Sequence, residues 1–189
     1  MKRCAVFLLT LATLAWIAAP ASAQTKQSSL QKYRWISHLT APSISQSKAA
    51  PGFEKLSSLA GEWQGEDSRG GKLRVSYELI ANGTSLIETL MPAKEPNMVT
   101  IYHLDGDNLM MTHYCSMNNQ PRMRAAAATG DIKKLEFSFV DATNMSSPDH
   151  AYMSNLVLTF QDKDHLSHEW TMTHGDQKMP VVFKLERAK

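Results

Sequence analysis

Apolar and polar residues alternate along short segments of the chain from Leu73 onward, and turn signals separate these segments at intervals of roughly 8 to 12 residues. An alternation with a period of two is typical of a β-strand with one buried face, whereas an amphipathic helix repeats every 3.6 residues. The expected strands are 73–80, 84–91, 98–104, 109–116, 122–129, 135–142, 153–160, 166–173 and 181–187. A first strand at 63–66 brings their number to about ten.

This number of strands predicts the fold class. About ten short antiparallel strands are more than an open sheet usually holds without curling, and closure removes the exposed sheet edges. Asn82-Gly83 is a strong signal for a hairpin between two of these strands. We therefore expect an all-β fold, an antiparallel up-and-down β-barrel of about ten strands.

The N-terminal segment has the pattern of a secretory signal peptide. Lys2 and Arg3 precede an apolar run over residues 5–19, and Ala21-Ser22-Ala23 matches an Ala-x-Ala cleavage site. The run is shorter than the roughly 20 apolar residues that span a bilayer. We expect residues 1–23 to be removed, and the mature protein to be periplasmic or secreted, without a transmembrane segment and monomeric.

Two segments separate the signal peptide from the strands. Residues 24–50 are rich in Ser, Gln and Lys and predict a flexible leader. Residues 51–59 place Phe53, Leu56 and Leu59 on one helical face and predict a short helix before the first strand. The expected domain organisation is signal peptide 1–23, leader 24–50 and barrel domain 51–189.

Charge and cysteine content exclude two classes of interaction. Lys2 and Arg3 account for the whole net charge of +2, so the mature chain is neutral. Nucleic acids and anionic membranes are bound by clustered basic residues, so we expect neither as the principal partner. Without Cys4 of the signal peptide, Cys115 is the one remaining cysteine, and an internal disulfide is impossible. Stability must come from a packed core.

A short motif at the start of the barrel resembles a known superfamily. Gly61-x-Trp63 follows the predicted helix, and Arg187 lies in the last strand. This arrangement is similar to the signature of the calycins, which include the lipocalins, in which the Trp packs across the barrel floor against a late Arg or Lys. The resemblance implies a structural role for Gly61, Trp63 and Arg187 and assigns no catalytic residue.

Several longer segments look like an uncharacterised family of exported bacterial lipocalin-like domains. They are Ile87-Glu88-Thr89-Leu90, the stretch 99–106 and Thr112-His113-Tyr114-Cys115. That resemblance implies a fold and a compartment but no established activity.

Hairpin parity predicts which side chains face the barrel interior, because a slip of one residue turns every side chain to the other face. Across Asn82-Gly83, Tyr77 lies opposite Glu88, and a loop at 105–108 pairs residue 100 with residue 113. A loop at 162–164 turns His168 and Trp170 inward. The same face continues through Met98, Thr100, Tyr102, Leu109, Met111, His113, Cys115, Met123, Ala125 and Ala127.

We expect the small Ala125 and Ala127 to leave room for a ligand beside the large inward residues. The expected function is therefore to bind a small, largely apolar molecule inside the barrel, since mostly apolar pockets with a few polar groups suit that task. An enzyme is the less favoured class. The candidate ligand-binding residues are Tyr77, Glu88, Tyr102, Met111, His113, Cys115, His168 and Trp170.

Catalytic chemistry is the first alternative. Glu88 and His113 could act as an acid/base pair on a small enclosed substrate, each tuned by burial. His113 and Cys115 share a face but lie about 6.6 Å apart along the strand, beyond the reach of a nucleophile pair. A structural role is favoured for both.

Metal and haem binding are further alternatives. His165 and His168 point to opposite faces of a strand and cannot chelate one ion without a bulge, so no metal site is expected. Small calycin barrels resembling nitrobindin hold haem through one barrel histidine, and His113 or His168 could be that ligand. The longer glycine-rich motif of that family is missing after Gly65.

Overall fold

The computed structural model describes residues 47–189, so the predicted signal peptide (1–23) and most of the predicted leader (24–50) lie outside the described residues. Within the described part, one α-helix, α2 (Ala50–Ser57), precedes ten strands. The strands are β1 (Gly61–Asp67), β2 (Lys72–Ile80), β3 (Ser85–Pro92), β4 (Met98–Asp105), β5 (Asn108–Tyr114), β6 (Gln120–Ala125), β7 (Lys134–Thr143), β8 (Tyr152–Phe160), β9 (His165–His174) and β10 (Gln177–Arg187). A 3₁₀ turn, η3 (Ala81–Gly83), joins β2 to β3.

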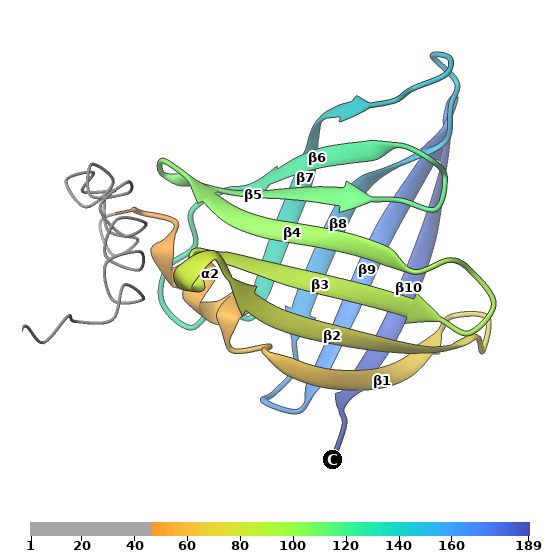
Figure 1. Cartoon of the computed structure of the whole chain (residues 1–189). Coiled ribbons are helices and arrows are strands. Elements are labelled where there is room, and N and C mark those ends of the chain that lie inside the picture. The colour runs from red at the N-terminus through yellow and green to blue at the C-terminus, as the bar shows by residue number, and fades with distance from the viewer. Residues whose placement is uncertain (1–46) are drawn as a thin grey trace, which may run out of the picture. The chain divides into compact units, whose positions relative to one another are not determined.

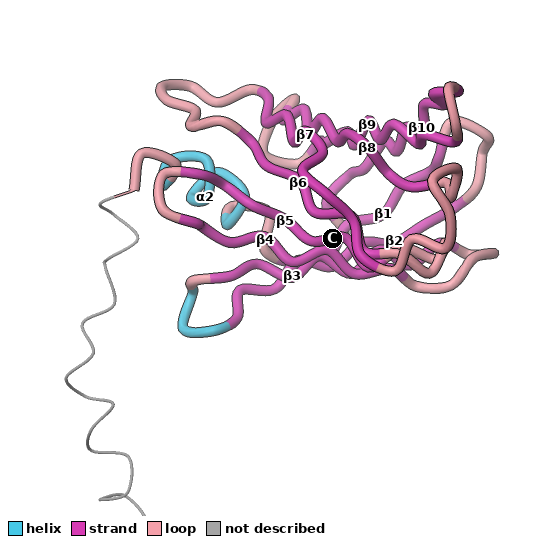
Figure 2. The backbone as a smooth tube through the Cα atoms, turned by 90° about the horizontal axis from the view of Figure 1, so that it is seen from above, coloured by secondary structure: helices cyan, strands magenta, loops and turns pink. Residues whose placement is uncertain are grey.

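The strands form a closed antiparallel barrel, as the sequence predicts. Each strand pairs with its neighbours in sequence, and β1 pairs with β10 to complete the circle. Figures 1 and 2 show β7 to β10 side by side in one wall, facing β1 to β4 across the interior. This barrel with a short helix at one end fits a calycin-like fold. No helix within residues 47–189 is long and apolar enough to cross a membrane.

The predicted strand registers are confirmed in the three hairpins that matter for the interior. Tyr77 pairs with Glu88 across β2 and β3, and Thr100 pairs with His113 across β4 and β5. His168 of β9 pairs with Leu158 of β8. Since side chains alternate along each strand, these registers place all six residues inside the barrel, where they are buried.

The prediction for the strand at 122–129 is wrong at its C-terminal end. Strand β6 ends at Ala125, and Ala127 is exposed rather than part of the inner face. Alanine carries little apolar surface, so an alanine run gains little from continuing along the buried face. The pairing of β6 with β7 also shifts register between Arg122 and Met123.

Helix α2 closes one end of the barrel. Phe53 and Leu56 are 2% and 0% exposed and belong to the core cluster of the barrel. A methyl group added at Gly52 would lie 3.3 Å from Leu109 Cδ2 and 3.5 Å from Leu135 Cδ2. The missing side chain at Gly52 therefore lets the helix backbone lie close to β5 and β7.

Trp63 and Arg187 form the contact that the calycin resemblance implies. The indole N–H of Trp63 donates to the Leu59 carbonyl at 2.8 Å, and the Arg187 guanidinium lies 4.4 Å from the centre of the Trp63 ring. Arg187 also donates to the carbonyls of Ala60 and Ser58, at 2.9 and 3.0 Å. The arginine therefore ties the segment after α2 to the last strand.

Candidate functional site

A row of polar side chains crosses the inner face of four neighbouring strands. Tyr77 on β2 pairs with Glu88 on β3, Glu88 pairs with Thr100 on β4, and Thr100 pairs with His113 on β5. All four side chains are between 0% and 3% exposed. Polar groups at successive pairing positions thus replace the apolar residues that an ordinary barrel core would carry.

The opposite wall closes this row into a ring. The His113 ring lies 4.6 Å from the Trp170 ring, centre to centre, and Trp170 is two residues from His168 on β9. The hydroxyl of Tyr77 lies 2.8 Å from His168 Nε2. We call this ring the polar belt, and its members are Tyr77, Glu88, Thr100, His113, Trp170 and His168.

Glu88 is the acidic member of the polar belt. It is fully buried, and its Oε2 accepts a hydrogen bond from the Tyr102 hydroxyl at 2.8 Å. Burial raises the pKa of Glu88 to about 7, although the hydroxyls of Tyr102 and Tyr77 oppose the shift. Burial also raises the pKa of both tyrosines, so they remain protonated near neutral pH.

The two histidines of the belt are neutral. Burial lowers the pKa of His113 to about 4 and that of His168 to about 3, because the charged imidazolium loses its hydration inside the barrel. His113 Nδ1 lies 2.9 Å from the Thr100 hydroxyl oxygen. With Glu88 protonated below about pH 7, the belt then carries no charge.

Three atoms of the polar belt have no hydrogen-bond partner among residues 47–189. They are Glu88 Oε1, His168 Nδ1 and Trp170 Nε1. An unpaired buried polar atom costs about 1–3 kcal/mol, so a barrel that only had to fold would gain stability from apolar residues here. The three atoms mark the belt as the candidate functional site.

Within residues 47–189 the expected open cavity beside Ala125 is not present. Ala125 is 1% exposed, and its pairing partners Leu109 and Phe137 are 1% and 0% exposed. A side chain beside a water-sized cavity would keep some exposed surface toward it. Large residues on both neighbouring strands fill the volume that the alanine leaves. Glu88 and His168 are likewise 0% exposed.

The barrel wall is less continuous at the end opposite α2. Pairing between β7 and β8 stops at Ser138 and Asn155. Just beyond that point Phe139 is 38% exposed. Met153 and Val181 are only partly buried and pack against the core. Backbone pairing between β7 and β8 therefore does not extend to this end of the wall.

The structure brings most of the candidate ligand-binding residues together. Tyr77, Glu88, His113, His168 and Trp170 belong to the polar belt, and Tyr102 contacts it through Glu88. The other two candidates, Met111 and Cys115, are buried on the same face. Burial raises the pKa of the Cys115 thiol, so this cysteine has the character of a core residue.

Two polar residues that are at most 1% exposed, Thr100 and Asn119, are absent from the site that the sequence predicts. The sequence pattern places Thr100 on the inner face but does not include it in the site, where it lies beside His113. Asn119 is 0% exposed and donates from Nδ2 to the Ala151 carbonyl at 2.8 Å, while its Oδ1 has no partner among the described residues. Asn118-Asn119 resembles a solvent-exposed turn, so the sequence carries no signal for this burial.

The proposed acid/base pair is not in direct contact. Thr100 lies between Glu88 and His113 in the register, and each of the two has its own hydrogen-bond partner. The predicted opposite orientation of His165 and His168 is confirmed. His165 is exposed and contacts Asp162, whereas His168 faces the interior.

The interior residues do not fit a haem. Both candidate ligands are buried, His168 against Tyr77 and Phe183 and His113 against Thr100 and Trp170, and at 0% and 2% exposure neither ring has space beside it for a macrocycle. Within residues 47–189 no group of three or more His, Cys, Asp or Glu side chains is placed to hold a metal ion.

Comparison with known proteins gives little guidance. No protein-family model matches the chain, and no curated protein is a detectable relative. One solved structure with partial similarity is described as "Structure of EF1p2_mFAP2b bound to DFHBI". The two sequences are 8% identical, and the match covers 72% of this chain and 98% of the chain in that structure. The TM-score is 0.35. Fold and site therefore rest on the strand pairing and the contacts given above.

Proposed function

We propose that this protein is an exported binding protein that holds one small, largely apolar molecule against the polar belt. The observation that carries the proposal is the set of three unpaired atoms, Glu88 Oε1, His168 Nδ1 and Trp170 Nε1, on inward-facing side chains. A ligand that hydrogen-bonds to them removes a penalty that folding alone leaves in place.

The belt also indicates the chemistry of the ligand. The indole N–H of Trp170 can only donate, so the ligand must offer an acceptor oxygen or nitrogen. Both histidines are neutral, and the pKa of Glu88 is about 7, so an uncharged ligand avoids placing an unpaired charge in the barrel. Buried apolar residues next to the belt, such as Met111 and Leu156, suit an apolar body.

Binding requires side chains to move, because the belt is enclosed. Met153 and Val181 are only partly buried and pack against the core, and the pairing of β7 with β8 stops at Ser138 and Asn155. Methionine is unbranched and adapts its shape at low cost, so Met153 suits a covering position. We propose that the ligand reaches the belt where this pairing stops.

Export is the second part of the proposal and rests on the signal peptide pattern at residues 1–23. The mature chain should start at Gln24. Intact-mass measurement of protein recovered from outside the cytoplasm of its host tests this start, and exported protein that retains residues 1–23 would contradict it.

Native mass spectrometry of protein purified from its own host tests ligand binding. The expected result is one additional small-molecule mass per chain, released on denaturation. Trp170→Phe removes the indole N–H but keeps an aromatic ring, and should lower ligand occupancy. Tyr114→Phe is the control, since Tyr114 is 48% exposed, and should leave occupancy unchanged.

A second variant guards against a folding defect at Trp170. Glu88→Met keeps the length of the side chain but removes both carboxyl oxygens, and should also lower occupancy while its near-ultraviolet circular dichroism matches the wild type. The proposal is overturned if wild-type protein carries no added mass and also fails to bind the neutral apolar dye Nile red saturably.

A further inference from the structure

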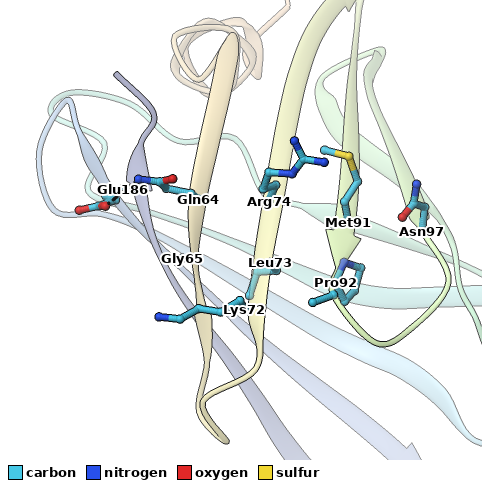
Figure 3. A pocket seen from close by; sticks show the side chains of 10 residues that line it. Gln64, Gly65, Lys72, Leu73, Arg74, Met91, Pro92, Asn97 and Glu186 are labelled. Atoms are coloured by element: carbon cyan, nitrogen blue, oxygen red, sulfur yellow. Dashed lines mark hydrogen bonds between the residues drawn. The ribbon is translucent and has the colours of Figure 1, made fainter.

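A groove with a volume of ≈ 680 Å³ lies on the outside of the barrel, away from the polar belt. Figure 3 shows the residues that line it, which come from β10, β1, β2, β3 and the loop after β3. Glu186, Gln64, Arg74 and Met91 occupy successive pairing positions across these four strands. A volume of this size lies within the range of about 300–1,000 Å³ that is typical of small-molecule sites.

Most of the charged side chains in the groove already have partners. Lys72 Nζ lies 2.7 Å from Glu66 Oε2. Glu186 Oε1 accepts a hydrogen bond from Gln64 Nε2 at 3.0 Å. Arg74, in contrast, makes no side-chain hydrogen bond or ion pair with the part of the chain that the structure describes. Its guanidinium is therefore the group that is free to bind a ligand.

The surroundings of Arg74 differ on its two sides. Figure 3 shows Arg74 between Gln64 and Met91, with Asn97 beyond Met91. Met91 pairs with Arg74 and supplies an apolar side chain on one side of it, while Pro92, Ala93 and Asn97 line the groove further along. An anionic group on Arg74 would thus have an apolar surface beside it.

We propose that this groove binds a monocarboxylate with a short apolar chain, held at its carboxylate by Arg74. The guanidinium can make two parallel hydrogen bonds to a carboxylate, which a lysine cannot do. The apolar chain would lie over Met91. This site is separate from the proposed interior site and takes an anion rather than a neutral molecule.

The neighbouring acids restrict the ligand to a single negative charge. Glu186 lies two strands from Arg74 and Glu66 lies on the adjacent strand, although Lys72 neutralises Glu66. A phosphate or a polyanion would bring additional charge toward these carboxylates. A monocarboxylate satisfies Arg74 and keeps its uncharged chain on the Met91 side.

Isothermal titration of the mature chain with sodium octanoate tests the proposal. Saturable binding is expected, and Arg74→Gln should weaken it by up to about five-fold, because an ion pair at an exposed site contributes at most about 1 kcal/mol. Arg124→Gln is the matched control. Arg124 is also exposed, lies on β6, and makes no side-chain hydrogen bond or ion pair within residues 47–189. Its substitution should change affinity by less than two-fold.

Two further measurements separate this site from the barrel interior. Arg74→Lys keeps the charge but loses the paired hydrogen bonds, so its affinity should lie between wild type and Arg74→Gln. 1-Octanol, with the same chain and no charge, should bind the groove far more weakly than octanoate. Octanoate binding that is absent, or that survives Arg74→Gln but falls in Trp170→Phe, would overturn the groove proposal and leave the interior proposal standing.

Discussion

The hydroxyl of Tyr77 lies 2.8 Å from His168 Nε2 and joins β2 to β9 across the barrel interior, between residues 91 positions apart in the sequence. Tyr77→Phe removes this hydroxyl and leaves His168 without either hydrogen bond. The expected loss is about 1–3 kcal/mol of unfolding free energy, measured by urea denaturation. Tyr114→Phe, at an exposed position, should stay within about 0.5 kcal/mol of wild type. Equal effects of the two variants would contradict a structural role for the cross-barrel bond.

Glu88 should make the protein less stable as the pH rises. The pKa of Glu88 is 4.5 in its ordinary state and about 7 in the folded barrel, so the folded protein retains a proton that the unfolded chain releases. The contribution of Glu88 to the free energy of unfolding is therefore fully present below pH 4.5. It falls by about 3 kcal/mol between pH 4.5 and 7. Glu88→Gln has no charge to bury, and should match wild type near pH 4.5 and exceed it by about 3 kcal/mol at pH 8. A stability difference that does not change with pH would refute the raised pKa.

The two belt histidines should produce the opposite pH dependence. Burial lowers the pKa of His113 to about 4 and of His168 to about 3, from 6.5. The unfolded chain binds both protons below pH 6.5 and the folded protein does not, so stability falls on acidification. In Glu88→Gln the free energy of unfolding should fall by about 2.4 kcal/mol between pH 6 and pH 5. In wild type the folded protein holds a proton on Glu88 that the unfolded chain releases, and this offsets one of the two protons that the unfolded histidines bind. The change in the free energy of unfolding should therefore be about half as large.

Trp63 should be essential for stability. It is 1% exposed, its N–H is bonded to Leu59, and Arg187 covers its ring. Trp63→Ala should cost roughly 3–5 kcal/mol through the cavity that it leaves. Arg187→Ala should cost about 1–2 kcal/mol from the loss of the cation–π contact. If Trp63→Ala lowers the free energy of unfolding by less than about 1 kcal/mol in denaturant, the Gly61-x-Trp63 motif is not important for stability.

Gly65 should not tolerate a side chain. A Cβ at this position would lie 1.9 Å from the Lys184 carbonyl oxygen on the paired strand β10, and a backbone atom of the sheet cannot easily move away. Gly65→Ala should therefore cost about 3 kcal/mol or more. Gly83→Ala is the comparison, because Gly83 has a φ of +80° but open space around it, and should cost only about 1–2 kcal/mol. Thermal unfolding of both variants distinguishes steric from conformational cost, and a similar loss for the two would contradict the close approach of β1 and β10.

The sequence by itself determined the strands and the pairing within each hairpin. Alternation with a period of two identifies the inner face, and a short turn sets the register on both sides of it, so the pairing of Tyr77 with Glu88 was predictable from neighbouring residues. The C-terminal end of β6 was not predictable in this way, because a run of alanines has no clear buried face.

Only the tertiary structure decided which inner side chains meet across the barrel. Contacts such as Tyr77 with His168 and His113 with Trp170 depend on strand tilt, stagger and barrel diameter, which local alternation does not encode. The same is true of the space beside Ala125, which side chains on neighbouring strands fill. Whether a buried polar atom has a partner depends on distances between strands far apart in the chain, so the unpaired atoms of Glu88, His168 and Trp170 could emerge only once the barrel was closed.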